Sequence, residues 1–274
     1  QPGDEVIIPE PCFVCYEPIT QLTGGVPVHI ATRAEDQFRL TADQLRAAIT
    51  PKTKLLIFPY PNNPTGAVMS AAEMEEIAAV LRETNVLVLS DEIYSELTYG
   101  LDRHVSIASL PGMAERTIVV NGFSKSYAMT GWRLGYLRAP RWLARRIIAF
   151  QSHTTSNPTT FAQYGAIAAL EGKADKEVRH MCEEFAKRRD LVYELISAIP
   201  GVKCIRPQGA FYLLCDVSSF GMTSEEFCNR LLAEEKLAAI PCCSFGAEGQ
   251  IRLSYACSEE NIRDAAGRLD AFCR

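Results

Sequence analysis

The fold is decided by residues 54–91, which read KLLIFPYPNNPTGAVMSAAEMEEIAAVLRETNVLVLSD. The runs 55–58 and 86–89 are wholly apolar and predict strands over 54–58 and 86–90. Between them, apolar residues recur at i, i+3, i+4 and i+7 from Met74, which is the spacing of a helix with one apolar face. A strand, a helix that packs on a sheet and a second strand, in this order, form a βα unit of a mostly parallel sheet.

Helix starts are marked by capping patterns. Thr41 with Gln44 and Ser70 with Glu73 each predict a capping box, in which two side chains satisfy backbone N–H groups that the first helical turn leaves unpaired. We therefore expect helices to begin directly after Thr41 and after Ser70.

The alternation of β-rich runs and amphipathic segments extends through the first two thirds of the chain. The predicted strands of this part are 5–8, 26–30, 54–58, 86–90, 117–121 and 134–138. Because such alternation is typical of βα units, we expect a three-layer α/β/α domain around a mostly parallel sheet.

The pattern changes after Leu170, and a long charged helix is predicted over 176–199. We place the domain boundary there, so that residues 1–175 form a large domain and residues 176–274 a smaller C-terminal α+β domain. Its predicted strands are 202–205, 210–216 and 250–255, and two further helices are predicted after Thr223 and Ser258.

Charge and hydropathy exclude several classes of partner. The 274 residues include 28 Lys and Arg against 33 Asp and Glu, a formal net charge of −5, and the basic residues are scattered. Nucleic acid and anionic membrane surfaces are therefore not expected as partners. The longest apolar runs are of strand length, so we expect no membrane-spanning helix.

The ten cysteines are irregularly spaced in a long chain without a signal-like apolar start. This pattern favours reduced thiols in a cytoplasmic protein over a disulfide framework. Cys12 and Cys15 have the CxxC spacing, but no second such pair follows, and the adjacent Cys242 and Cys243 are poorly disposed to share one tetrahedral metal ion. The sequence therefore predicts no metal site.

Four polar clusters follow apolar strands, namely 62–66, 91–94, 124–125 with Arg133, and Arg252. Open α/β sheets bind their ligands at the carboxyl ends of the strands, so the clusters predict one shared site.

Each cluster also has a purely structural interpretation. Asn-Pro-Thr-Gly at 63–66 is turn chemistry, Asp91 can cap the segment after it, and Lys125 can be a solvated lysine. Arg252, between two apolar neighbours, either faces solvent at a sheet edge or points inward, where it would need an anion.

The segment 122–136, GFSKSYAMTGWRLGY, is similar throughout to the lysine-loop signature of the class I and II aminotransferases, which are pyridoxal-phosphate enzymes of fold type I. PNNPTG at 61–66, SDEIY at 90–94 and Arg252 resemble further motifs of this family and follow in the family's order. The resemblance covers nearly the whole chain. It implies transfer of an amino group between an L-amino acid and a 2-oxo acid in two half-reactions, with the aspartate/aromatic branch favoured.

The resemblance also implies roles for the residues that would face the cofactor ring. Lys125 would bind the aldehyde of pyridoxal phosphate and move the proton, and Asp91 would keep the pyridine nitrogen protonated. Asn63 and Tyr94 would hydrogen-bond the phenolic oxygen of the ring, and Phe13 would stack on its face. Asn63 would in addition contribute to substrate binding.

The remaining site residues would hold anionic groups. Ser124 and Arg133 would bind the cofactor phosphate, and Arg252 would clamp the substrate α-carboxylate with two parallel N–H groups. A homodimer is implied as well, because the sites of this family lie at the subunit interface.

The chain departs from the family in two places. Relatives have a further N-terminal segment that contributes to substrate and phosphate binding, whereas this chain opens on the turn Gln1-Pro2-Gly3-Asp4 without Met, as expected for a cut inside a larger protein. Gly122 stands where some relatives have a phosphate-binding hydroxyl.

Three other functions remain open. A C–S β-lyase of the same fold would keep the same residues but release pyruvate and ammonia. A non-catalytic sensor module would bind the cofactor without turnover, and a truncated, inactive remnant of an enzyme would bind it weakly.

Overall fold

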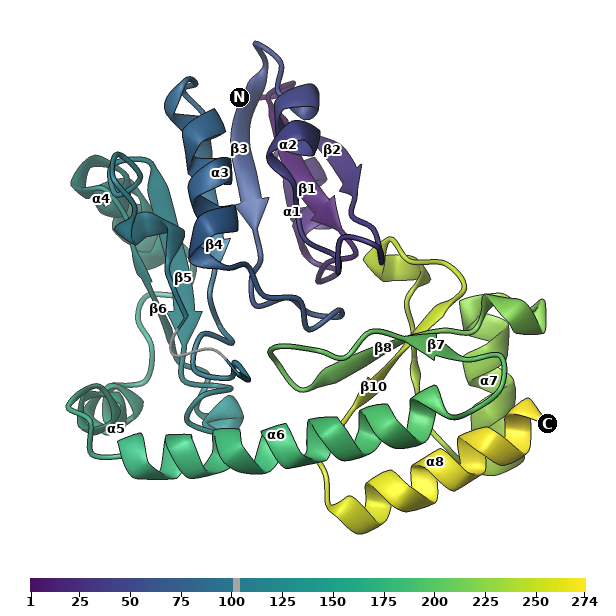
Figure 1. Cartoon of the computed structure of the whole chain (residues 1–274). Coiled ribbons are helices and arrows are strands. Elements are labelled where there is room, and N and C mark those ends of the chain that lie inside the picture. Colours follow the sequence, from purple (N-terminus) through teal and green to yellow (C-terminus); the bar gives the residue numbers. More distant parts are fainter. Residues whose placement is uncertain (101–103) are drawn as a thin grey trace.

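The larger part of the molecule is built on a six-stranded, mostly parallel sheet (Figure 1). The structure is a computed structural model, and it describes residues 1–100 and 104–274. The strand order of the sheet is β2-β1-β3-β4-β5-β6, and β6 runs antiparallel to β5. The predicted strands are found, with ends that differ by a residue or two. They are β1 (Glu5–Glu10), β2 (Val26–Ala31), β3 (Thr53–Phe58), β4 (Leu87–Asp91), β5 (Thr117–Gly122) and β6 (Gly135–Arg138).

Short helices connect the parallel strands, and the predicted helix starts are confirmed. The side chains of Thr41 and Ser70 each accept a hydrogen bond from the backbone N–H three residues on, and the side chain at that position accepts one from the backbone N–H of the cap residue. The predicted apolar face of α3 packs against β3 and β4 in one buried cluster. The helices are α1 (Tyr16–Leu22), α2 (Ala42–Ala48) and α3 (Ala71–Arg82).

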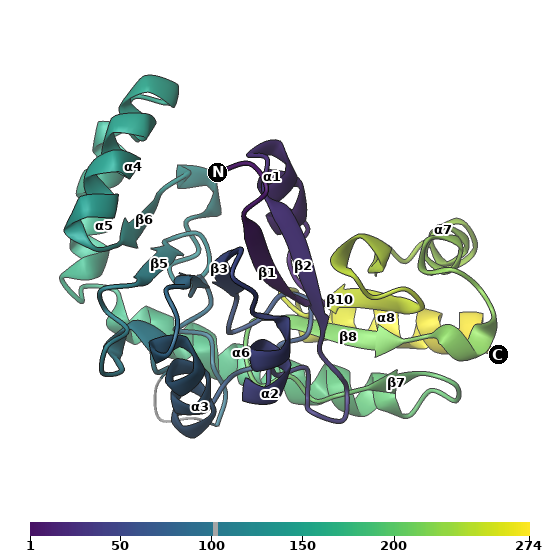
Figure 2. The same cartoon turned by 90° about the horizontal axis from the view of Figure 1, so that it is seen from above.

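A second, four-stranded sheet lies on the other side of the molecule, as both views show (Figures 1 and 2). Its order is β7-β8-β10-β9, and its pairings are antiparallel. Phe185, Phe227 and Leu269, one from each helix that covers this sheet, share a buried cluster with β8 and β10. The boundary between residues 175 and 176 stays a prediction. The elements are α6 (Asp175–Ser197), β7 (Lys203–Cys204), β8 (Tyr212–Asp216), α7 (Ser224–Glu235), β9 (Ile240–Pro241), β10 (Gln250–Ser254) and α8 (Glu259–Cys273).

Two helices lie at the outer side of the molecule beyond β6, α4 (Arg141–Thr154) and α5 (Thr160–Leu170) (Figures 1 and 2). The sequence analysis predicted neither. Leu143, Ile147 and Phe150 of α4 recur at i, i+4 and i+7, so this segment carries a helical spacing in its sequence. None of the side chains of α4 is buried, however, and α5 buries only alanines. Among the described residues, no helix combines the length and the apolar character that a membrane span requires.

The connection between β3 and α3 docks onto the segment that leads into β8. The backbone N–H groups of Gln208 and Gly209 both donate to the carbonyl oxygen of Gly66, each at 2.9 Å. Gly66 has a φ of 69°, and a Cβ at this position would lie 2.3 Å from the Cβ of Pro207. Because only glycine fits, the turn at 62–66 can lie directly against the small sheet.

Replacing Gly66 by Ala should lower the free energy of unfolding by about 1–3 kcal/mol, because the new methyl group overlaps Pro207 and the backbone is left-handed. Gly267→Ala is the matched control. A Cβ at Gly267 would meet nothing within 4 Å. Because alanine favours the helix more than glycine does, we expect this variant to raise the free energy of unfolding by up to about 1 kcal/mol. Urea unfolding followed by circular dichroism measures both variants. If Gly66→Ala were as stable as the unchanged chain, the turn would not be needed for docking.

Candidate functional site

A cavity of about 320 Å³ is lined by residues of both sheets and has the size of a small-molecule site. The strand ends and loops of the large sheet contribute most of its lining, and β8 and β10 of the small sheet contribute one side chain each. The polar clusters that follow the apolar strands therefore meet at one place. Of the eight predicted site residues, the lining includes Phe13, Asn63, Asp91, Tyr94, Lys125 and Arg252.

Asp91 ends β4 and turns its carboxylate toward this cavity. Its Oδ2 accepts a hydrogen bond from the Tyr16 hydroxyl at 2.7 Å, and its Oδ1 accepts one from the N–H of Ile93 at 3.2 Å. Burial raises the pKa of Asp91; the two hydrogen bonds oppose the rise and the charge of Glu92 adds to it. Within the described residues no cation forms an ion pair with this carboxylate, so the site has a place for a positively charged partner.

The neighbouring carboxylate of Glu92 is held in a different way. Its Oε1 accepts hydrogen bonds from the hydroxyls of Ser90 at 2.9 Å and Ser106 at 2.6 Å, and its Oε2 lies 3.1 Å from Nε2 of His104. Although burial pushes the pKa of Glu92 upward, these partners hold it below the usual value. Glu92 is therefore satisfied within the protein, whereas Asp91 faces the cavity.

Lys125 lies in the loop after β5 and is half-buried at the cavity wall. Burial lowers its pKa, and the positive charges of Arg252 and Arg133 lower it further. Its Nζ lies 5.7 Å from the centre of the Phe211 ring. A lysine whose neutral form is favoured in this way is a better nucleophile and base than a solvated one.

Arg252 points inward, which decides between the two alternatives that the sequence left open. Its strand β10 lies between β8 and β9 and so is not a sheet edge. Its Nη1 donates to Oδ1 of Asn63 at 2.7 Å. The guanidinium carbon lies 4.3 Å from the ring centre of Tyr212 and 5.1 Å from that of Phe245. Its Nε is buried and has no hydrogen-bond partner in the described part of the chain.

Tyr94 is buried beside the same cavity, and its hydroxyl lies 3.0 Å from the hydroxyl of Tyr212. Burial raises the pKa of Tyr94, and Tyr212 adds to the rise. The Tyr94 hydroxyl therefore keeps its proton and is available as a donor.

Ser124 and Arg133 share the loop of Lys125 but are not part of the cavity lining. Arg133 is exposed, its Nη1 donates to the carbonyl of Thr130 at 2.9 Å, and its backbone is left-handed with φ 52° and ψ 51°. Strain of this kind concentrates at functional sites. At Gly122 a Cβ would lie 3.2 Å from Cα of Gly135, so the close approach of β5 and β6 leaves little room for a hydroxyl-bearing side chain. The roles of Ser124 and Arg133 stay predictions.

Two residues of the site were missed by the sequence analysis, Tyr16 and Tyr212. Tyr16 binds Asp91 and follows Phe13 by three positions, and the two rings pack edge to face with centres 6.2 Å apart. Tyr212 lies within the predicted strand 210–216, where alternation alone indicates a core residue. Neither position has a sequence signal that distinguishes it from ordinary core.

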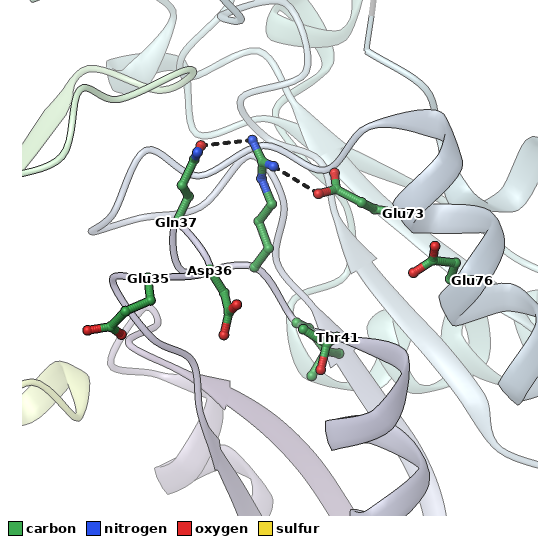
Figure 3. Close-up of a pocket in the computed structure, with 8 residues that line it drawn as sticks. Glu35, Asp36, Gln37, Thr41, Glu73 and Glu76 are labelled. Atoms are coloured by element: carbon green, nitrogen blue, oxygen red, sulfur yellow. Dashed lines mark hydrogen bonds and ion pairs between the residues drawn. The ribbon is translucent and has the colours of Figure 1, made fainter.

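A second hollow, of about 220 Å³, is lined by the acidic side chains of Glu35, Asp36, Glu73 and Glu76, which Figure 3 shows. Arg39 is also part of its lining. The guanidinium of Arg39 donates to Glu73, to Gln37 and Gln208, and to the carbonyl of Val68. Because each of its three nitrogens is engaged by the protein, Arg39 is not placed to bind an anionic ligand as Arg252 is.

Comparison with known proteins agrees with this site. The family model described as aminotransferase class I and II matches residues 1–269. The chain is 44% identical to an aspartate aminotransferase of Pyrococcus abyssi, over 99% of this chain and 70% of that protein. It is 43% identical to aromatic-amino-acid aminotransferase 2 of Thermococcus litoralis, over 98% and 69%. The crystal structure of an aromatic aminotransferase from Pyrococcus horikoshii has a TM-score of 0.95 and 44% identity, over 99% of this chain and 73% of that chain.

These matches confirm the resemblance noted in the loop 122–136 and the fold type that it implies. They extend along both sheets, so the lysine loop and the small-sheet arginine belong to the matched region. The chain therefore belongs to the class I and II aminotransferases, pyridoxal-phosphate-dependent enzymes that move an amino group from an amino acid to a 2-oxo acid.

Proposed function

We propose that the cavity lined by both sheets is the active site of this chain and that its amino donor is an L-amino acid of the acidic or aromatic type. The observation that carries the proposal is the meeting of Lys125, Asp91 and Arg252 in one cavity. An amine, a buried carboxylate and a guanidinium are the groups that this reaction requires. The aspartate and aromatic aminotransferases among the relatives support the substrate class.

The residues present fit pyridoxal phosphate. Asp91 is a buried carboxylate without a cation among the described residues, and Nε of Arg252 is buried without a partner there. A cavity of about 320 Å³ has room for a substituted pyridine ring. When bound, the cofactor takes up the amino group on its aldehyde carbon, and its ring draws electron density from the substrate α-carbon.

The residues of the large sheet would orient the ring. Asp91 would hold the pyridine nitrogen protonated, and the hydrogen bond from Tyr16 at 2.7 Å would fix the direction of that carboxylate. Asn63 and Tyr94 would bind the phenolic oxygen. Phe13, exposed at the wall of the cavity, would cover one face of the ring.

Lys125 would act as the base. Because burial and two neighbouring arginines lower its pKa, its neutral form is present at a lower pH than for a solvated lysine. The neutral Nζ would take the proton from the substrate α-carbon and return a proton later in the half-reaction.

The anionic ends of cofactor and substrate would be held by arginines. Nη1 of Arg252 is engaged by Asn63, which leaves Nε and Nη2 as a parallel pair of donors for the substrate α-carboxylate. Ser124 and Arg133 would bind the phosphate. The charge of Arg133 lowers the pKa of Lys125, which supports a position near that end of the site.

A C–S β-lyase is the rival that uses the same lysine. The aminotransferases among the relatives favour transfer over elimination. Product analysis separates the two, because a lyase forms pyruvate and ammonia from a cysteine conjugate without an added 2-oxo acid.

Adding pyridoxal phosphate to the chain should produce a visible absorption band that decays when glutamate is added. Lys125→Ala should abolish the lysine-dependent band and slow turnover by about 10²–10⁴-fold or more, because the proton carrier is lost. Lys173→Ala, at a side chain that is 68% exposed, is the matched control and should behave like the unchanged chain. A band that does not change when any amino acid is added would indicate a non-catalytic module. If no absorption band forms, cofactor binding by this chain alone is contradicted.

Asp91→Asn should stabilise the cofactor-free protein and abolish turnover. Folding raises the pKa of Asp91, so the folded state disfavours its charge and stability is lost as the pH rises through that pKa. Asparagine removes this cost. The gain in Tm should be present at pH 7 and shrink toward acid pH, where Asp91 is protonated in both states. Asp43→Asn, at a side chain that is 95% exposed, should change little, and a lower Tm for Asp91→Asn at pH 7 would refute the argument.

We further propose that the protein forms a homodimer and is cytoplasmic. Apolar side chains that are 49–73% exposed gather on α4 and α5, and such patches are typical of interaction surfaces. All ten cysteines are free thiols, which fits a reducing compartment. The exposed apolar residues on the two helices are Trp142, Ile148, Phe150, Phe161, Tyr164, Ile167 and Leu170.

Light scattering should give about twice the chain mass of 30.3 kDa at micromolar concentration. Phe150→Asp should shift the protein toward the monomer, because a charge would be buried in the interface. Leu232→Asp, at a 50% exposed leucine of α7, is the control and should leave the mass unchanged. A monomer at every concentration would contradict the dimer.

A further inference from the structure

We propose that Tyr212 is a positioning residue that serves two partners at once: its ring orients the Arg252 guanidinium for the substrate carboxylate, and its hydroxyl sets the direction of the Tyr94 proton. The inference rests on the proposed function, in which Arg252 binds the carboxylate and Tyr94 the cofactor. Tyr212 lies on β8 of the small sheet, is 7% exposed and lines the cavity.

The ring of Tyr212 fixes the plane of the guanidinium. The carbon of the Arg252 guanidinium lies 4.3 Å from the Tyr212 ring centre, and Phe245 covers it from 5.1 Å. The hydrogen bond from Nη1 to Asn63 then fixes the rotation of the group. A guanidinium held over aromatic rings and anchored at one nitrogen presents its remaining donors in one direction, toward the open cavity.

The hydroxyl of Tyr212 lies 3.0 Å from the Tyr94 hydroxyl, and either oxygen can donate. A phenol has one proton to donate and lone pairs to accept. When Tyr94 donates to the phenolic oxygen of the cofactor, its own oxygen can accept only from a second donor, and Tyr212 is placed to be that donor. A chain of two hydroxyls polarises the outer bond and strengthens it.

Other charged and titratable groups face Tyr94 as well. Asp91, Lys125 and Arg252 line the same cavity, from three different segments. Tyr212 differs from them because it contacts Tyr94 and Arg252 simultaneously and connects a residue of the large sheet with one of the small sheet. Removing the hydroxyl and removing the ring should therefore have different effects.

The test uses Tyr212→Phe and Tyr212→Leu in the cofactor-loaded protein. The first readout is the pH titration of the cofactor absorption band without substrate. The second is the dissociation constant of succinate, an unreactive carboxylate, measured from the change of that band. Tyr255 is another buried tyrosine, and its hydroxyl donates a hydrogen bond to the carbonyl oxygen of Ala210. Tyr255→Phe is therefore the control for the loss of a buried hydroxyl. Arg252→Lys calibrates the loss of the carboxylate clamp.

Tyr212→Phe should raise the apparent pKa of the band by about 0.4 to 1, because the phenolic oxygen loses support through Tyr94. Its succinate dissociation constant should stay within about twofold of the unchanged chain, since the ring is kept. Tyr212→Leu should weaken succinate binding by roughly 3- to 30-fold. Tyr255→Phe should change neither quantity.

An unchanged titration in Tyr212→Phe, or unchanged succinate binding in a folded Tyr212→Leu, would overturn the proposal that one side chain serves both partners. Circular dichroism establishes folding of each variant, and Tyr212→Phe keeps the proposal testable if the leucine variant does not fold. If Arg252→Lys also leaves succinate binding unchanged, or the unchanged chain has no titrating band, the proposed site itself fails and the role of Tyr212 fails with it.

Discussion

The site depends on one contact between the two sheets, the docking of the turn 62–66 onto the segment before β8. The carbonyl of Gly66 accepts two backbone hydrogen bonds from that segment, and its missing Cβ lets Pro207 approach. The same turn carries Asn63, whose side chain receives the hydrogen bond of Arg252. Because a charged hydrogen bond needs both partners held at about 2.7–2.9 Å, this docking contributes directly to the carboxylate clamp.

The cavity collects polar groups that the protein leaves incompletely satisfied. Asp91 has a raised pKa, Lys125 a lowered one, and Nε of Arg252 lacks a partner among the described residues. Each of these groups costs folding free energy in the cofactor-free state. Two buried clusters, one on each sheet, supply the opposing stabilisation. The same groups favour a ligand with a cationic ring nitrogen and anionic ends. The groups that destabilise the cofactor-free protein are therefore the groups that bind the ligand.

Much of the fold could be predicted because its signals are local. The capping boxes at Thr41 and Ser70 and the apolar face of α3 arise from residues three or four positions apart, and the structure contains them as predicted. The helix α4 was not predicted although its apolar residues have helical spacing, and it buries none of its side chains. Ser124 and Arg133 were assigned by resemblance, and neither lines the cavity. At Gly122 the chain departs from the family pattern, and the sequence alone does not explain this glycine, because the close approach of β5 and β6 is a tertiary contact.

The sequence by itself determined the strands of the large sheet, the capped helices, the chemical groups of the site and their resemblance to the aminotransferases, since these follow from spacing and from short motifs. Only the tertiary structure decided which way Arg252 points and that Tyr16 and Tyr212 belong to the site. The deciding contacts join Tyr16 to Asp91, Tyr94 to Tyr212 and Asn63 to Arg252, across 75, 118 and 189 positions. No local pattern encodes a contact over such separations, because it forms only when the packing of two sheets brings distant segments together.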